Sequence, residues 1–373
     1  MLHTNNILLK LMLIPFALLY RFVVSLRNFL YDNGVFSSKE FQIPVIAVGN
    51  IMVGGTGKTP HTEMIAELLR KQFKIAVLSR GYKRKSKGYL EVQPDSSYTQ
   101  VGDEPLQIKR KFPDVVVSVC ENRVKGIYRL MDEYPDLNAV ILDDAFQHRR
   151  VKPGISVLLN NYHHPLSKDH LLPYGRMREG HSASLRADII IVTKCPEKMN
   201  PMERRIMLKE IDPKPYQTLF FSTFQYHSPS PVFENLAGSL SGSLSEYNVL
   251  VITGIAFSAN LIDYLHEQCQ TIEHLRFADH HSFSKADMQK AAQLFDKMPE
   301  NKIILTTEKD SIRLFENKYL SDDLKKAMYY LPITVKMMGG NDDVQQFEKH
   351  FITYVSTNKR YSKLYKNTGL NHA

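Results

Sequence analysis

The sequence predicts an α/β protein with a P-loop domain built on a doubly wound, mostly parallel sheet, a smaller second α/β domain and an apolar N-terminal helix. Three observations carry this prediction. Apolar runs alternate with helix-like stretches, the runs are continuously apolar, and a glycine-rich loop joins the first run to a helix. Continuous apolar strands are typical of parallel sheets covered on both faces. At 373 residues the chain can form two domains.

The N-terminal segment 1–35 is predicted to form a membrane-associated helix. Residues 7–30 are mostly apolar, but Pro15 and interspersed basic residues interrupt the ~20-residue apolar stretch that a clean membrane span needs. No small-residue cleavage site follows, so a secretory signal is not expected. An interfacial or shallowly inserted helix is favoured, and a buried core helix is the alternative.

The first domain is expected over residues 36–225. Its strands are predicted at residues 43–48, 75–79, 115–119, 139–142, 155–159 and 188–192. A helix is predicted over residues 60–71, and residues 199–225 are expected to form a helix followed by an extended connector.

The smaller domain is expected over residues 226–356, with a Gly/Ser-rich stretch near its border. Its strands are predicted at residues 249–253, 271–277, 303–306 and 329–335, and its helices at residues 258–269, 285–295 and 342–355. The basic, polar tail 357–373 is expected to be frayed.

Composition and charge narrow the class of protein. Hydrophobic residues make up 43% and charged residues 23%, which excludes extended disorder. The three cysteines lie far apart, which argues against a disulfide framework or a structural zinc site and fits a reducing compartment. A net charge of +9 in basic clusters suits phosphate-rich partners. No nucleic-acid-binding module accompanies the clusters, so we expect a membrane surface and no nucleic acid.

The glycine-rich loop predicts a nucleotide phosphate site. It consists of Val53, Gly54, Gly55, Thr56, Gly57, Lys58, Thr59 and Pro60 and lies between a predicted strand and a predicted helix. Glycines let backbone N–H groups turn onto phosphate oxygens, and the helix N-terminus adds partial positive charge. Lys58 supplies a full charge, and Thr59 the hydroxyl expected to bind Mg²⁺. The full motif has glycine where this chain has Met52.

Two pairs of acids are candidates for the chemistry. Asp143 and Asp144 end a predicted strand, where an acid in a P-loop protein holds Mg²⁺. Because adjacent side chains on an extended backbone point in opposite directions, we expect one to face the metal and the other to orient Lys58 or a water. Asp103 and Glu104 precede Pro105. Either acid could cap a helix or serve as a general base, and spacing does not decide between these.

Other candidates lie at predicted strand ends. His280 follows a strand of the smaller domain and could assist a carboxylate or be buried in a structural role. Arg80 and Tyr82 face the same predicted rim, and Arg123 is a candidate for stabilising phosphoryl charge. Residues 192–196, Val-Thr-Lys-Cys-Pro, lack the acid of a guanine-reading element, which favours ATP over GTP.

The ensemble of motifs resembles the tetraacyldisaccharide 4'-kinases of lipid A biosynthesis over nearly the whole chain. The motifs are residues 48–50, 53–60, 79–82 (Ser-Arg-Gly-Tyr), 102–105 (Gly-Asp-Glu-Pro), Arg123, 143–148 (Asp-Asp-Ala-Phe-Gln-His), 178–179 (Arg-Glu), 279–280 (Asp-His) and 307–310 (Thr-Glu-Lys-Asp). The chain departs from the family pattern at Ala145, where glycine is common, and at Met52, where threonine is common.

The resemblance implies a kinase at the cytoplasmic face of the inner membrane, peripheral or singly anchored. It would transfer the γ-phosphate of ATP, with Mg²⁺, to the 4'-hydroxyl of a membrane-embedded, acylated disaccharide 1-phosphate, with no obligate protein partner. Asp103 matches the family's catalytic base, His280 the histidine paired with it, and Arg123 an active-site arginine. Asp143 and Asp144 match the metal-site acids. Arg80, Tyr82 and Glu104 are expected near the substrate.

Two alternatives remain open at this point. A membrane-recruited P-loop ATPase of the partitioning type would have no phosphoryl acceptor and no need of Asp103 or His280. A kinase acting on a small soluble acceptor would have no need of the N-terminal helix.

Overall fold

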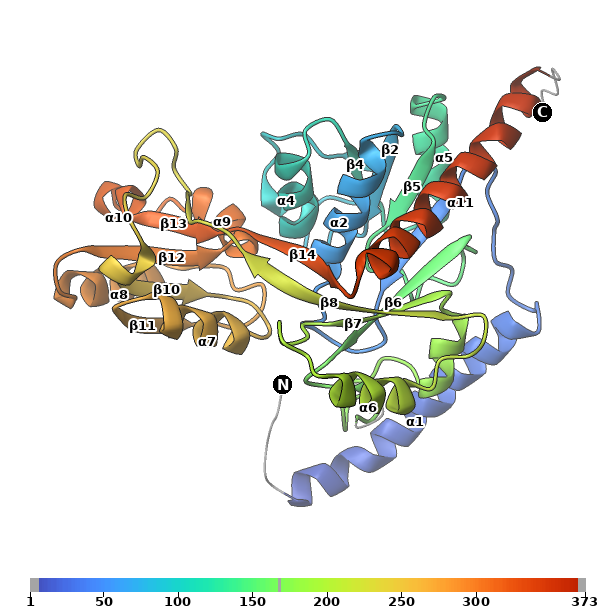
Figure 1. Cartoon of the computed structure of the whole chain (residues 1–373), viewed down its shortest axis with the longest axis horizontal. Helices are drawn as coiled ribbons and strands as arrows, with labels where there is room; N and C mark the ends of the chain where they lie inside the picture. The colour runs from blue at the N-terminus through green and yellow to red at the C-terminus, as the bar shows by residue number, and fades with distance from the viewer. Residues whose placement is uncertain (1–6, 167–168, 368–373) are drawn as a thin grey trace.

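A nine-stranded sheet forms the centre of the larger of two lobes (Figure 1). The structure, a computed structural model, describes residues 7–166 and 169–367. The sheet has the order β14-β8-β7-β6-β1-β5-β2-β4-β3, and all neighbours are parallel except the edge strands β14 and β3. Its strands are β1 Val45–Gly49, β2 Ile75–Ser79, β3 Leu90–Glu91, β4 Val116–Val119, β5 Ala139–Leu142, β6 Ile155–Asn161, β7 Ile189–Thr193, β8 Thr218–Tyr226 and β14 Ile333–Met338.

Helices cover both faces of this sheet, which explains its continuously apolar strands. Along β1, Ile46 and Val48 join one buried cluster, whereas Val45 and Ala47 join another on the opposite face. The helices of this lobe are α2 Lys58–Arg70, α3 Tyr98–Val101, α4 Asp103–Lys111, α5 Arg123–Glu133, α6 Pro201–Ile211 and α11 Asn341–Asn367, with a 3-10 helix at His181–Arg186. The predicted doubly wound fold is therefore confirmed.

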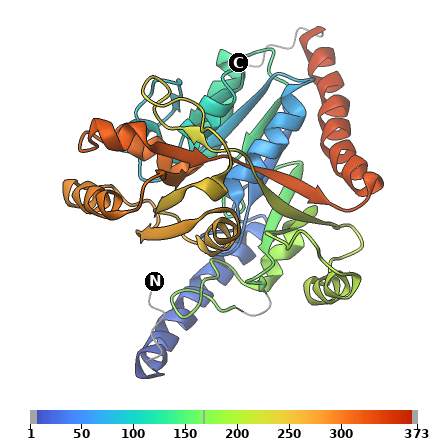
Figure 2. The same ribbon diagram turned by 60° about the vertical axis from the view of Figure 1, so that its left-hand side comes forward.

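The smaller lobe is built on a five-stranded sheet of order β11-β10-β12-β13-β9, with only β9 antiparallel (Figure 2). Its strands are β9 Ser230–Pro231, β10 Asn248–Thr253, β11 Thr271–Arg276, β12 Lys302–Thr307 and β13 Met328–Leu331. Its helices are α7 Ala259–Gln268, α8 Lys285–Lys297, α9 Glu308–Phe315 and α10 Asp322–Lys326, with a 3-10 helix at Leu244–Glu246. The predicted second α/β unit is present.

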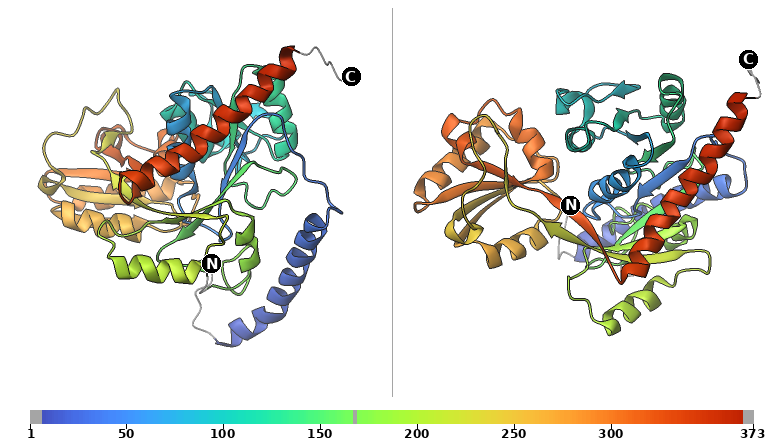
Figure 3. Two further views of the ribbon diagram at one scale, coloured as in Figure 1. Left: turned by 45° about the vertical axis from the view of Figure 1, so that its right-hand side comes forward. Right: turned by 45° about the horizontal axis from the view of Figure 1, so that its top comes forward.

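The strand predicted over residues 329–335 is in fact two strands in different sheets. It divides at Pro332, which has no N–H to donate to a ladder. β13 stays in the smaller sheet, and β14 pairs with β8 in the larger one. β8 itself was expected to be only an extended connector. These two antiparallel strands join the lobes (Figure 3).

The C-terminal helix α11 lies on the larger lobe, although residues 333–356 were expected in the smaller domain. The reason is burial: Phe347, Phe351 and Val355 belong to the cluster that covers one face of the larger sheet. α11 continues to Asn367, through much of the segment expected to fray. Residues 1–6 of the predicted N-terminal segment and 368–373 of the predicted tail lie outside the described residues.

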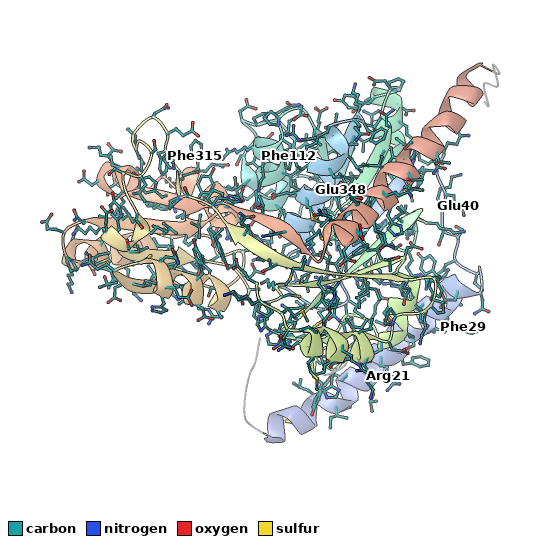
Figure 4. All side chains as sticks on the ribbon, viewed as in Figure 1. Arg21, Phe29, Glu40, Phe112, Phe315 and Glu348 are labelled. Carbon is teal, nitrogen blue, oxygen red and sulfur yellow. The ribbon has the colours of Figure 1, made fainter. Side chains whose placement is uncertain are left out.

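This placement of α11 gives a stability prediction. Phe351 is fully buried, so Phe351→Ala should lower the free energy of unfolding of the larger lobe by about 3–5 kcal/mol through lost burial and a residual cavity. Glu348→Ala, one turn earlier on the exposed side of α11 (labelled in Figure 4), should change it by less than about 0.5 kcal/mol. Denaturant titration compares the two variants, and equal stabilities would contradict the packing of α11 on this lobe.

The helix α1 (Ile7–Asp32) runs along the outside of the larger lobe (Figures 1 and 3). Its segment Met12–Asp32 has a mean hydropathy of 1.4 and the length to cross a membrane, and its most apolar part is not buried against the rest of the described chain. Arg21 and Phe29, labelled in Figure 4, are both exposed. The predicted N-terminal apolar helix is present, and it is not a buried core helix.

Candidate active site

A cavity of about 430 Å³ lies between the two lobes. All eight residues of the predicted phosphate loop, 53–60, line it. The remaining lining residues of the larger lobe and of the strands that join the lobes are Tyr82, Lys83, Glu104, Gln107, Asp144, Arg178, Lys194, Phe224, Tyr226 and Ile333. The smaller lobe contributes Ile255, Ala256, Phe257, Asn260, Leu261, Asp279, His280, Thr307, Glu308, Lys309 and Leu331. The cavity therefore combines a glycine-rich loop with charged groups from both lobes.

The phosphate loop has the backbone that its glycines allow. It follows β1 at the centre of the large sheet and leads into α2, which begins at Lys58. Gly57 has a φ of 81° and caps this helix, and a Cβ there would lie 2.7 Å from Phe224. A side chain at Gly55 would collide with Phe257 of the smaller lobe. Glycine is thus required both for backbone conformation and for the close approach of two aromatic rings.

Asp144 faces the phosphate loop from the end of β5. Its carboxylate lies 3.7 Å from Lys58 Nζ and 3.3 Å from the Arg178 guanidinium. Burial alone would raise the pKa of Asp144, but the charges of Lys58 and Arg178 lower it below its ordinary value. Asp144 is therefore ionised and lines the same cavity as Thr59, and carboxylate and hydroxyl oxygens are ligands that suit Mg²⁺.

Asp143 has a different set of contacts from Asp144, whose own backbone is left-handed (φ 46°) and not extended as the expectation for this pair assumed. It is fully buried and accepts hydrogen bonds from Thr62 Oγ1 (3.0 Å) and Ser79 Oγ (3.4 Å). Burial and the nearby charges of Glu104 and Asp144 raise the pKa of Asp143 to about 7. It is not among the described residues that line the cavity. Its contacts tie α2 and β2 to the end of β5.

Asp103 and His280 meet across the two lobes. His280 Nδ1 lies 2.9 Å from Asp103 Oδ2, although 177 positions separate them in the chain. The other oxygen, Oδ1, accepts from the N–H of Glu104 (3.0 Å), so Asp103 both supports the start of α4 and engages the histidine. His280 lines the cavity. Asp103 is only 5% exposed and lies behind His280, in contact with it.

Lys309 sets the donor and acceptor roles of the two His280 ring nitrogens. Its ammonium donates to His280 Nε2 (3.1 Å) and to Glu104 (2.9 Å), and it lies 3.5 Å from Asp279. Because a lysine can only donate, His280 Nε2 is the acceptor and Nδ1–H donates to Asp103. Burial would raise the pKa of Asp103, but the hydrogen bond from His280 and the charges of Lys309 and Arg313 hold it well below its usual range.

Lys309→Met should therefore change the pH dependence of any reaction in which this pair accepts a proton. Without this positive charge the pKa of Asp103 rises, which depletes its basic form, so the acid limb of the pH profile of kcat/KM should move toward neutral pH. Lys309→Arg keeps the charge and should keep the limb close to that of the wild type. An unchanged profile in Lys309→Met would contradict this role.

The other predicted site residues occupy different environments. Tyr82 and Glu104 line the cavity, and the Tyr82 ring lies 4.9 Å from that of His280. Arg80 is exposed and does not belong to the lining described. Arg123 is 2% exposed and donates to the carbonyls of Cys120 (3.0 Å) and Asp143 (3.3 Å). In this structure Arg123 thus supports the loop that carries the paired acids and does not reach the cavity.

Several cavity residues had no predicted role. Lys309 belongs to the Thr-Glu-Lys-Asp motif at residues 307–310. Its contacts with Glu104 and His280 arise only from the tertiary fold. Lys194, whose pKa burial lowers to about 8, lies 5.6 Å from the centre of the Phe224 ring. Phe257 approaches the phosphate loop from a loop after β10. Phe257 could have been predicted as a cavity residue, because its loop follows the carboxyl end of a parallel strand, where ligands bind in such folds.

Known proteins resemble this chain in sequence along nearly its full length. A profile of the family described as tetraacyldisaccharide-1-P 4'-kinase matches residues 9–352. The chain is 46% identical over 362 residues to the tetraacyldisaccharide 4'-kinase of Phocaeicola vulgatus, covering 96% of this chain and 98% of that protein. It is 44% identical over 360 residues to that of Bacteroides thetaiotaomicron, covering 94% of both.

A solved structure agrees with the sequence comparisons. The crystal structure of LpxK from Aquifex aeolicus in complex with ATP superposes with a TM-score of 0.69 at 28% identity, covering 93% of this chain and 99% of that one. The family profile and the full-length relatives give the same assignment. The chain therefore belongs to the tetraacyldisaccharide-1-P 4'-kinase family.

Proposed function

We propose that this kinase transfers the γ-phosphate of ATP to the 4'-hydroxyl of an acylated glucosamine disaccharide 1-phosphate, a lipid A precursor. The observation that carries the proposal is the cavity in which the phosphate loop faces His280, whose other ring nitrogen is bonded to the buried Asp103. An enzyme that only hydrolyses ATP has no need of a base formed across two lobes. The ATP complex of the Aquifex aeolicus protein supports the choice of nucleotide.

The phosphate loop would hold the nucleotide. Backbone N–H groups of residues 53–60 and the N-terminus of α2 are placed to bind the phosphates, with Lys58 countering their charge. Thr59 and Asp144 would hold Mg²⁺, and Asp143 would orient the strand end that carries Asp144. When bound, Mg²⁺ neutralises charge on the β- and γ-phosphate oxygens.

The Asp103–His280 pair would act as the general base. As the acceptor oxygen forms its bond to the γ-phosphorus, the bond from that phosphorus to the β–γ bridging oxygen breaks and ADP leaves. The proton of the acceptor hydroxyl passes to His280 Nε2 in place of its hydrogen bond from Lys309, while Asp103 holds Nδ1–H and its negative charge balances the imidazolium that forms. Arg178 and Lys58 are the cations best placed to offset charge on the transferring group.

The acyl chains of the acceptor would stay in the bilayer. The exposed apolar side of α1 supports a membrane-bound enzyme at the cytoplasmic face, where ATP is available. An acceptor of this kind also explains why the chain combines such a helix with a catalytic body of two lobes.

Incubation with γ-labelled ATP, Mg²⁺ and a monophosphorylated, acylated disaccharide tests the proposal. A doubly phosphorylated product with the new phosphate on the 4'-oxygen is expected. A partitioning-type ATPase would release labelled inorganic phosphate and leave the acceptor unchanged. Equal transfer to a deacylated, soluble disaccharide would instead point to a soluble acceptor.

A further inference from the structure

One side of α1 is hydrogen-bonded to two loops of the larger lobe. One loop follows β5 and carries Gln147, and the other carries Arg178 and Glu179. Tyr20 Oη donates to the carbonyl of Arg178 (2.9 Å), and the Arg27 guanidinium donates to the carbonyl of Gln147 (2.8 Å). Further along the helix, Asn28 Nδ2 donates to Glu179 (2.9 Å). Tyr20, Arg27 and Asn28 share one side of the helix because they are seven and eight positions apart. α1 is thus attached through specific polar contacts.

Residues of these two loops contact each other and are connected to the phosphate loop. The Arg178 guanidinium contacts Asp144 (3.3 Å) and Gln147 Oε1 (3.2 Å). Gln147 Nε2 donates to the carbonyl of Asn50 (2.6 Å), and Asn50 Nδ2 donates to Thr56 Oγ1 in the phosphate loop (2.6 Å). A short chain of hydrogen bonds therefore connects α1 to the phosphate loop, and Arg178 connects it to Asp144.

The rest of the surface of α1 has the opposite character. Its large apolar side chains are exposed: Met12, Ile14, Phe16, Leu18, Leu19, Phe22, Val23, Leu26 and Phe29. Contiguous exposed apolar surface of this kind marks membrane or protein contacts. The adjoining Arg21 is also exposed and can reach lipid phosphates, which favours an anionic bilayer as the occupant.

We propose that the bilayer acts as an activator of the phosphate site, because it favours the position of α1 in which Tyr20 and Arg27 are bonded to the catalytic loops. A detached α1 lying in a bilayer would leave these polar groups without partners, which is costly in an apolar medium. In water the same groups would be hydrated, so detachment would cost less. The bilayer thus distinguishes between the attached and detached states, as any effector must. Tyr20 and Arg27 are positioning residues for Arg178 and Gln147.

The inference rests on the proposed function only in assuming that the phosphate loop binds a nucleotide. Its test uses a fluorescent ATP analogue with Mg²⁺ and no acceptor, with and without vesicles of phosphatidylethanolamine and phosphatidylglycerol. For the full-length wild type, saturating vesicles should tighten nucleotide binding by about five-fold or more. By linkage, the nucleotide should tighten vesicle binding by the same factor.

Tyr20→Phe and Arg27→Met should still float with vesicles but lose most of this gain in nucleotide affinity. Arg27→Lys, which retains a donor, should recover part of it. The matched control is Phe22→Ser on the exposed apolar surface of α1, which should need more lipid to bind but show the full gain once bound.

Two results would overturn the coupling: wild-type nucleotide affinity that is indifferent to vesicles, or a full gain in Tyr20→Phe and Arg27→Met. Either would leave the proposed kinase activity intact. Failure of the analogue to bind under any condition would instead count against the proposed function.

Discussion

Asp103→Asn is expected to lower phosphate transfer to the acylated acceptor by about 10²–10⁴-fold, the contribution typical of a positioned general base. Asparagine keeps the shape of the side chain, so the start of α4 and the contact with His280 can persist while the negative charge is lost. Asp103 is not among the residues described as lining the cavity, so nucleotide binding should remain nearly unchanged. The predicted loss lies in kcat and not in affinity for ATP.

Asp95→Asn is the control for this prediction. Asp95 is an exposed acid of the same lobe and should keep full activity when changed. Titration with a fluorescent nucleotide separates binding from transfer in each variant. Normal transfer by Asp103→Asn would overturn the assignment of the base. A loss confined to nucleotide binding would show that Asp103 supports the phosphate site and does not act as the base.

Lys58→Met is expected to weaken nucleotide binding and also to lower kcat by about 10²–10³-fold, because its charge faces the site where phosphoryl charge develops. Lys58 begins α2, its side chain is only 13% exposed, and Asp144 is its one ion-pair partner among the described residues. Methionine keeps the length and most of the packing of the side chain. After loss of the Lys58 charge, Asp144 would still form its ion pair with Arg178.

Lys71→Met provides the matched control at the other end of α2, where the lysine side chain is 64% exposed. Steady-state kinetics with the acylated acceptor compare the two variants. Wild-type kcat in Lys58→Met, or equal losses in both variants, would contradict the role of Lys58 at the phosphates.

The sequence predicted local structure well where local pattern decides it. β2 and β5 have the predicted bounds, because short, continuous apolar runs bounded by polar residues leave little choice. The strand over residues 329–335 was wrong for a related reason. Its apolar pattern continues through Pro332, and pattern alone does not say that its two halves belong to different sheets. The proline was the available signal.

The candidate site also has features that local sequence predicted and features that depend on the tertiary fold. The phosphate loop was predictable because glycine spacing between a strand and a helix dictates its backbone. The contact between Asp103 and His280 was not, since it depends on how two lobes are joined by β8 and β14; only the family resemblance pointed to it. Arg123 has the chemistry of a phosphate ligand, yet its guanidinium is used on backbone carbonyls. The hydrogen bonds of α1 to catalytic loops carry no sequence signal.

The central claim is that this two-lobed cavity couples ATP consumption to phosphorylation of a membrane-held sugar. The most direct test measures the ratio of phosphate transferred to ATP consumed, in vesicles with and without the acylated acceptor. We expect a ratio near one with the acceptor and very little ATP consumption without it. ATP consumption at the same rate in both kinds of vesicle, with no phosphate on the disaccharide, would contradict this claim.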